Sequence, residues 1–391
     1  MRSKATDTLK KYTMFIMLVV VVILFEVLLR LAGRGTFFNS KNMTNLISQN
    51  AYVLILATGM LMCILTGGNI DLSVGSLVAF VGAIAGKIIV ENHGNIYAGI
   101  AVCLLIGLVA GVWNAIWIAY VRIPAFIVTL SSMMVFRGLT HITLGGYTLS
   151  PFPKNYQAIF NGYPSASMDE RTRYVFTMGI GAFICIVFLL SQILGRQSRK
   201  KKGYEVESII WIILKFVIIT FILLGIFHFL GGDRGIPYTL ILLAAIVGVY
   251  SFITSKTVPG RNLYAIGGNE KAAKLSGINT NRTLFFAYTN MGFLSGVAAL
   301  VCVGRYSAAM PTLGTSYEMD AIASCFIGGA ATYGGIGTVF GAVVGALLMG
   351  VLNNGMQYMG LDPNWQLVIK GMVLLAAVAF DVISKKRARA L

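Results

Sequence analysis

Long runs of apolar residues alternate with short polar stretches along the whole chain. A helix of about 20 apolar residues crosses the ~30 Å hydrocarbon layer of a membrane. The runs are continuous rather than alternating residue by residue, so they favour helices over strands. We therefore expect an all-α, polytopic transmembrane bundle that forms a single domain over residues 1–391. Twelve spans are predicted, at about 12–31, 46–66, 72–90, 96–120, 125–145, 174–194, 207–230, 236–254, 284–304, 319–333, 335–352 and 366–383; the tenth is short enough to be re-entrant.

Composition agrees with a membrane protein. The chain is 57% hydrophobic and 12% charged, and its mean hydropathy is +0.79. A soluble domain does not need so much apolar surface. The first apolar run follows a basic segment, as in a signal peptide, but it is too long and lacks a small-residue cleavage site, so we expect an uncleaved span. Five scattered cysteines and three distant histidines form no ligand motif, so no metal site and no cofactor are expected in this chain.

Positive charge is concentrated in four segments. The chain has 31 basic and 14 acidic residues, and most of the excess lies in the N-terminus, in 196–202, in 256–282 and in the C-terminal tail. An even number of predicted spans separates each neighbouring pair, so all four segments can face the cytoplasm. This places both termini on the cytoplasmic side of the membrane. Arg30, Arg34 and Lys41 oppose this assignment after the first span. No nucleic-acid-binding motif accompanies the charge, so nucleic acid is not an expected partner.

Glycines recur at helix-packing spacing, and two glycine-rich stretches share a plan. Small pairs such as Gly107/Gly111 and Gly292/Gly296 allow helix backbones to approach closely. The stretches 66–86 and 327–346 each have a Gly-Gly pair, a polar interval, and a glycine followed by Ser or Thr before another helix. They form a weak internal repeat. Transporters built from repeats often carry broken helices at matching positions, with the site at the repeat interface.

Asp71 lies in the first of these breaks, in "TGGNIDLSVGS". A carboxylate there can cap free N–H groups at the start of the following half-helix. It can also contact the hydroxyl groups of a solute, or take part in proton coupling. Ser73 has the same two readings, as a cap or as a solute contact.

The polar segment 255–283 is predicted to be a cytoplasmic loop with a short amphipathic helix. Asn269 is placed to cap that helix, Glu270 suits its first turn, and Gly277 is placed to end it. Ala272 and Ala273 would leave a small, flat surface that another protein can approach.

The sequence around this helix resembles a known family. Glu270-x-Ala272-Ala273-x-x-x-Gly277, with Gly268 and Asn269 before it, resembles the loop by which ABC importer permeases dock on their ATPase. "GRNLYAIGGNEKAAKLSGIN" is similar to the version in ribose, xylose and multiple-monosaccharide permeases. Four further stretches resemble that family in the same order: "TGGNIDLSVGS", "IPAFIVTLSSMMVFRGL", "DAIASCFIGGAATYGGIGTVFGA" and "NNGMQYMGLDPNWQLVIKGMVLL". The resemblance covers about residues 40–383. An apparent two-span insertion at 172–232 is similar to the xylose and multiple-monosaccharide subgroup.

The resemblance implies a type II ABC importer-like permease of the bacterial inner membrane that forms a homodimer around a central path. An extracytoplasmic sugar-binding protein would deliver a monosaccharide, and a separate ATPase subunit would drive transport, so no catalytic residue is expected here. The candidate path residues are polar or aromatic positions within spans: Asp71, Ser73, Trp113, Asn114, Thr129, Ser132, Arg137, Asn353 and Asn354.

Each candidate also has a structural reading. Trp113 can serve as a packing residue, Thr129 and Ser132 can bond to their own helix, and Asn353 and Asn354 can cap a helix end. Two further charged residues have structural readings only: Asp320 as a cap of the tenth span, and Lys370 as a side chain that extends to the membrane surface.

Two other functions remain open from the sequence. The same scaffold can import a nucleoside or another small polar solute. An ion-coupled secondary carrier, with Asp71 binding a cation, is the other possibility. The chain has no G-x-x-x-x-G-K-[ST] motif, so it is not expected to bind ATP through a P-loop.

Overall fold

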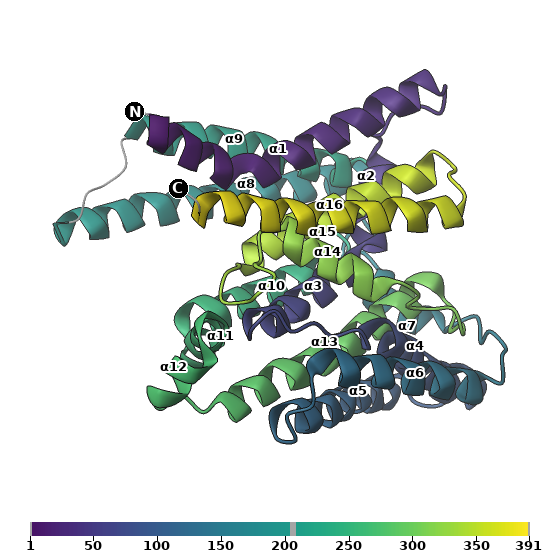
Figure 1. Ribbon diagram of the computed structural model, residues 1–391. Helices are drawn as coiled ribbons and strands as arrows, with labels where there is room; N and C mark the ends of the chain where they lie inside the picture. The colour runs from purple at the N-terminus through teal and green to yellow at the C-terminus, as the bar shows by residue number, and fades with distance from the viewer. Residues whose placement is uncertain (1, 204–208, 390–391) are drawn as a thin grey trace.

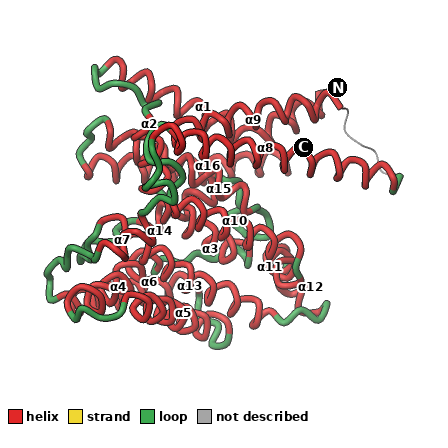
Figure 2. Tube along the Cα trace, turned by 180° about the vertical axis from the view of Figure 1, so that it is seen from behind, coloured by secondary structure: helices red, strands yellow, loops and turns green. Residues whose placement is uncertain are grey.

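The computed structural model describes residues 2–203 and 209–389, and every element of regular structure in these ranges is helical (Figures 1 and 2). The elements are α1 (Arg2–Leu31), α2 (Ser40–Gln49), α3 (Ala51–Leu65), α4 (Val74–Ala85), the π-helix η1 (Gly86–Glu91), α5 (Ile96–Ala119), α6 (Ala125–Leu144), α7 (Lys154–Asn161), α8 (Glu170–Lys201), α9 (Ile209–Gly231), α10 (Tyr238–Lys256), α11 (Val258–Gly268), α12 (Glu270–Leu275), α13 (Thr280–Tyr306), α14 (Tyr317–Ile327), α15 (Val339–Tyr358) and α16 (Pro363–Arg389).

Eleven of the twelve predicted spans correspond to apolar helices. Nine helical segments in the described ranges are long and apolar enough to cross a membrane, and shorter apolar helices lie at Phe216–Gly231 and Pro363–Ala379. The predicted tenth span, 319–333, forms only α14, whose 11 residues extend about 16 Å. Non-helical residues 328–338 follow it. This segment is a half-helix, and it does not cross the layer by itself.

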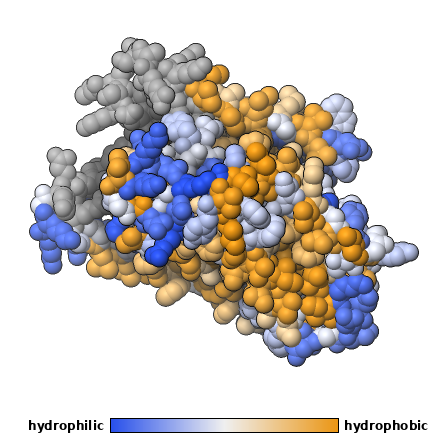
Figure 3. Space-filling view, turned by 60° about the horizontal axis from the view of Figure 1, so that its bottom comes forward, coloured by the Kyte–Doolittle hydropathy of each residue, from blue (hydrophilic) through white to orange (hydrophobic). Residues whose placement is uncertain are grey.

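The core is built around α3. All fifteen residues of α3 are buried, and apolar residues lie on every face of this helix. A helix that is apolar on every face lies either in a protein core or in the hydrocarbon layer of a membrane; here α13, α14 and α15 pack against it, so it lies in the protein core. On the face shown in Figure 3, hydrophobic residues form a broad band between hydrophilic residues near its ends, as a membrane-embedded surface requires.

The predicted close approach of glycine-bearing helices is confirmed between α5 and α13. A Cβ atom added at Gly292 would lie 2.4 Å from Gly111 Cα, and one added at Gly107 would lie 2.9 Å from Gly296 Cα. No side chain fits at such distances. The glycines therefore set the spacing of this helix pair.

The four basic segments lie at one end of the bundle. The N-terminus, the C-terminus, the end of α8 and the α11–α12 pair share the left side of Figure 1. This agrees with the even number of spans predicted between them. The two helices of the predicted insertion, α8 and α9, pack on each other, and α9 also packs on α2.

Candidate functional site

The first helix break is organised around Asp71. α3 ends at Leu65, and α4 begins at Val74; between them, Gly67 and Gly68 have φ of +118° and +77°, a region that favours glycine. Asp71 is only 2% exposed. Its Oδ1 accepts hydrogen bonds from the backbone N–H of Ser73 at 2.9 Å and from the Ser73 hydroxyl at 2.6 Å. The carboxylate thus closes the turn that precedes α4, where the helix dipole favours negative charge.

Four of the predicted residues form one hydrogen-bonded chain. Asn114 Nδ2 on α5 donates to Ser73 Oγ at 3.0 Å, and Ser132 Oγ on α6 donates to Asn114 Oδ1 at 2.6 Å. Asp71, Ser73, Asn114 and Ser132 are all buried. These hydrogen bonds join the start of α4 to α5 and α6. These groups hold the broken helix in place, and none of the four side chains is open to solvent in the single chain.

Thr129 and Trp113 lie apart from this chain. The hydroxyl of Thr129 is buried and donates to the carbonyl of Ala125 at 2.9 Å, within its own helix. Trp113 is 52% exposed on the outer face of α5, with its ring edge against Trp117 at a centroid distance of 5.5 Å. Trp113 therefore faces out of the single chain.

Arg137 contacts the segment between α13 and α14, which turns back into the bundle. It lies twelve residues into α6, about 18 Å from the start of that helix. Its Nη1 donates to the carbonyls of Pro311 and Leu313, at 3.0 and 2.9 Å. In the same segment, a Cβ at Gly314 would lie 1.9 Å from the carbonyl oxygen of Gly75 in α4. Helix α4 and the half-helix α14 therefore begin close together, at the depth of Arg137.

A second buried polar cluster surrounds Asp320 on α14, which has no exposed surface. Its Oδ2 accepts from Tyr52 Oη at 2.6 Å, Lys370 Nζ at 3.0 Å and Asn353 Nδ2 at 3.2 Å. Lys370 is 14% exposed, so the interpretation that it extends to the membrane surface is wrong. Nor does Asp320 cap α14, whose N-cap is Ser316. The cluster ties the half-helix to α3, α15 and α16.

Asn354 is oriented away from the Asp320 cluster that holds its neighbour. Its Nδ2 donates to Gln49 Oε1 on α2 at 3.4 Å, and Gln49 Nε2 in turn donates to Gln357 Oε1. Sequence reasoning missed Gln49 and Gln357, as it missed Tyr52, because amides and tyrosines near helix ends are common.

The predicted loop helix is present as α12. Asn269 Oδ1 accepts from the backbone N–H of Ala272 at 3.0 Å and so caps the helix, and Gly277, with φ of +82°, follows its end. Gly268 and Ala272 are exposed, whereas Ala273 is buried. The flat surface therefore includes only one of the two predicted alanines, and Leu275, 90% exposed, is its apolar side chain.

Arg122, which the sequence did not single out, fixes α12 to the rest of the bundle. It lies in the α5–α6 turn with φ of +66°. Its Nη1 donates to Glu270 Oε1 at 2.6 Å, and its Nη2 donates to Thr280 Oγ1 at 2.7 Å. One guanidinium thus links the α5–α6 turn, α12 and the start of α13.

The two helix breaks, one after α3 and one after α14, meet next to α11. The N–H of Gly335 donates to the carbonyl of Leu65 at 3.1 Å. A Cβ at Gly267, in the last turn of α11, would lie 1.9 Å from that carbonyl oxygen and 2.2 Å from the nitrogen of Gly335. We call these three residues the glycine junction. It joins the end of α3, the loop 328–338 and α11 through backbone contacts that leave no room for side chains.

Tyr264 adds a second link between α11 and the loop. Its hydroxyl donates to the carbonyl of Gly337 at 2.8 Å. Burial raises the pKa of Tyr264, so the hydroxyl keeps the proton that it donates. Movement of α11 and α12 must therefore displace both breaks or rupture these contacts.

Comparison with known proteins gives consistent matches over nearly the whole chain. A family model described as "Branched-chain amino acid transport system / permease component" matches residues 42–168 and 156–378. The xylose transport system permease protein XylH of Haemophilus influenzae is 36% identical over 379 residues, which cover 97% of this chain and 98% of the relative.

Two further relatives come from Escherichia coli strain K12. Its xylose transport system permease protein XylH is 37% identical over 353 residues, covering 90% of this chain and 88% of the relative. Its ribose import permease protein RbsC is 34% identical over 346 residues, covering 88% and 87%. No solved structure matches the chain. The broken apolar helices and these matches together establish that the chain belongs to the permease family described as branched-chain amino acid transport system / permease component, among relatives that are permeases for xylose and ribose.

Proposed function

We propose that this chain is the membrane subunit of an ATP-driven importer that takes up a monosaccharide, a pentose or a similar sugar. Relatives named as xylose and ribose permeases, aligned over nearly their whole length, support the cargo class. The observation that carries the mechanism is the glycine junction. It connects an exposed, capped surface helix to both breaks in the bundle.

The exposed helix α12 is the proposed docking site for a separate ATPase subunit. Leu275 offers an apolar anchor, and the Arg122–Glu270 contact holds the helix in position. Closure of the ATPase would push α12 and α11. The glycine junction and the Tyr264 hydroxyl would pass that displacement to α3 and to loop 328–338. ATP is consumed by the partner, so the proposal needs no cofactor in this chain.

The proposed path lies between two copies of the chain. The outer faces of α5 and α6 carry large exposed side chains, including Trp113 at 52%, Met134 at 67% and Ile142 at 78%. Arg137 is partly exposed beside them, and a guanidinium facing lipid is unfavourable. A second copy packed on this face would enclose Arg137 and Trp113 in a protein-lined, hydrated channel.

This arrangement suits transient passage of a sugar. The hydroxyl groups of the solute must exchange water for polar groups, because an unmet hydroxyl in an apolar medium is costly. A path that matched them too well would retain the solute. The polar groups of Asp71, Ser73 and Asn114 bond to one another, which supports a scaffold role and argues against Asp71 as the cation ligand of an ion-coupled carrier.

The proposal orients the chain with both termini and α11–α12 in the cytoplasm of a bacterial cell. The opposite end would then receive an extracytoplasmic sugar-binding protein. The positive charge at the α12 end supports this orientation, since basic loops are retained on the cytoplasmic side.

Uptake by whole cells tests the proposal. Cells that express the chain with its ATPase and binding protein should take up labelled D-xylose or D-ribose. Uptake should stop when ATP is depleted, and it should continue when an uncoupler collapses the proton gradient while ATP is maintained. Uptake that survives ATP depletion but stops with the uncoupler would support a secondary carrier instead.

A further inference from the structure

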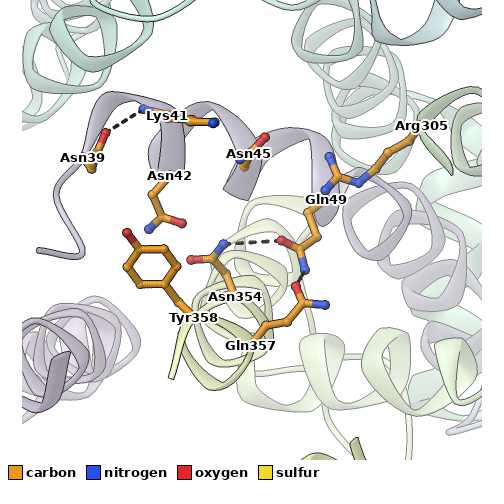
Figure 4. Close-up of a pocket in the computed structure, with 9 residues that line it drawn as sticks. All are labelled: Asn39, Lys41, Asn42, Asn45, Gln49, Arg305, Asn354, Gln357 and Tyr358. Atoms are coloured by element: carbon orange, nitrogen blue, oxygen red, sulfur yellow. Dashed lines mark hydrogen bonds between the residues drawn. The ribbon is translucent and has the colours of Figure 1, made fainter. Parts of the chain in front are cut away.

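A polar cavity of 420 Å³ lies between α2 and α15, at the end of α13 (Figure 4). This volume is in the range of small-molecule sites, which run from about 300 to 1,000 Å³. Its lining residues are Asn39, Lys41, Asn42, Asn45, Gln49, Arg305, Asn354, Gln357 and Tyr358.

The lining is dominated by amides. Six of the nine residues are Asn or Gln, two are cationic, one is a tyrosine, and none of these nine is acidic. An amide presents donors and an acceptor side by side, and a sugar hydroxyl is also both donor and acceptor. The hydrogen bonds from Asn354 to Gln49 and from Gln49 to Gln357 fix the orientation of three of these amides before any ligand arrives.

One buried acceptor in the cavity has no partner. Asn354 is 4% exposed, and its Oδ1 accepts no hydrogen bond from the described part of the chain. In Figure 4 this oxygen is directed into the space that also faces Asn42 and Tyr358. A buried carbonyl oxygen without a donor is unfavourable. The oxygen itself is buried in the single chain, so a ligand O–H would satisfy it once the Asn354 side chain turns toward the cavity.

The cavity lies at the end of the bundle opposite the α12 surface. α13 begins at Thr280, beside Arg122, and Arg305 lies in its last turn, about 40 Å away along the helix. α15 likewise begins next to loop 328–338 and carries Asn354 and Gln357 in its final turns. The cavity therefore faces the side from which an importer receives its solute.

We propose that this cavity, which lies apart from the α5–α6 face, is a first subsite that takes a neutral monosaccharide from the binding protein before the sugar reaches the path, with the amide groups of Asn354, Gln49 and Gln357 bonding to its hydroxyls. The inference rests on the proposed function. Lys41 and Arg305 donate hydrogen bonds to sugar oxygens here. A sugar acid is the alternative ligand, but the six amides favour the neutral form.

The test uses the permease reconstituted with its ATPase and binding protein. Labelled D-xylose and D-ribose uptake is measured together with ATP hydrolysis, for the wild type and for Asn354→Leu and Gln357→Met, which keep side-chain size but remove the amide. Asn92→Leu, at an exposed amide in the loop before α5, is the matched control. Thermal unfolding of each variant is measured in parallel.

Loss of one or two hydrogen bonds should lower uptake per ATP about two- to tenfold and change the xylose-to-ribose ratio. Asn92→Leu should change neither, and Asn354→Asp, which keeps the acceptor, should retain part of the uptake. Wild-type uptake per ATP and sugar preference in both amide variants would overturn the inference. A loss of uptake that only parallels a loss of thermal stability, with the sugar preference unchanged, would also overturn it. Weaker docking of the binding protein with the sugar preference unchanged would do the same.

Two further outcomes separate the possible failures. Stronger inhibition by D-xylonate than by unlabelled D-xylose would overturn the choice of a neutral ligand. If the wild-type complex imports no monosaccharide at all, the proposed function fails. If the wild type imports sugar and the amide variants import it as the wild type does, the subsite proposal fails and the proposed function stands.

Discussion

Replacement of Lys370 by methionine tests how the half-helix α14 is held. The ammonium group lies 3.0 Å from Asp320 Oδ2, in a cluster where Asp320 has no exposed surface. Methionine keeps much of the length of the side chain but removes the charge. Asp320 would then keep only the neutral donors Tyr52 and Asn353.

The expected loss is large because a buried charge would remain without its counter-charge. Removing one member of a buried ion pair typically costs about 3–5 kcal/mol of stability. Adding Asp320→Asn removes the remaining charge, and the double variant should lie within about 1–2 kcal/mol of the wild type, since neutral replacement of a buried pair is often tolerated. The cycle should therefore give a coupling energy of at least about 2 kcal/mol.

Denaturant titration of the purified permease in nanodiscs measures these differences in the free energy of unfolding. Lys87→Met is the matched control, because Lys87 contacts Glu91 at 2.7 Å but both side chains are about 40% exposed. It should change stability by no more than about 0.5 kcal/mol. If Lys370→Met is as mild as Lys87→Met, or if Asp320→Asn fails to restore stability, the cluster does not hold α14 in the way described.

Three other substitutions test the break and the coupling surface. Asp71→Ala should reduce uptake and lower stability by about 1–2 kcal/mol, because the buried N–H and hydroxyl of Ser73 would lose their acceptor, whereas Asp71→Asn should retain most of both; unchanged uptake and stability in Asp71→Ala would show that these hydrogen bonds do not hold the break. Glu270→Arg places like charges against Arg122 and should abolish stimulated ATP hydrolysis with normal membrane insertion, and Arg122→Glu should partly restore it; full stimulation in Glu270→Arg would contradict the docking role. Tyr264→Phe should lower the sugar imported per ATP, measured in proteoliposomes, while Tyr97→Phe at an exposed site should not; an unchanged ratio would separate Tyr264 from coupling.

Much of the bundle could be predicted from the sequence, because hydropathy and small-residue spacing report directly on membrane depth and helix contact. The α5–α13 packing at Gly111 and Gly292 is an example. The tenth span was the exception. Hydropathy averages over a window, so it cannot separate a half-helix such as α14 from the apolar, non-helical residues that follow it.

The candidate site was predictable as a set of residues but not as a set of contacts. Asp71, Asn114 and Ser132 attract notice because polar groups are rare in apolar runs. Their connection through Ser73 depends on how α4, α5 and α6 pack. Tyr52 and Asp320 are separated by 268 positions, so no local pattern could pair them.

The central claim is that the chain is a passive path moved by an ATPase that binds α12. Its most direct test is concentration of labelled sugar inside proteoliposomes that contain the permease alone, or the permease with its ATPase and binding protein. The account predicts uphill uptake only in the complete complex and only with ATP. Uphill uptake by the permease alone, driven by an ion gradient, would contradict it.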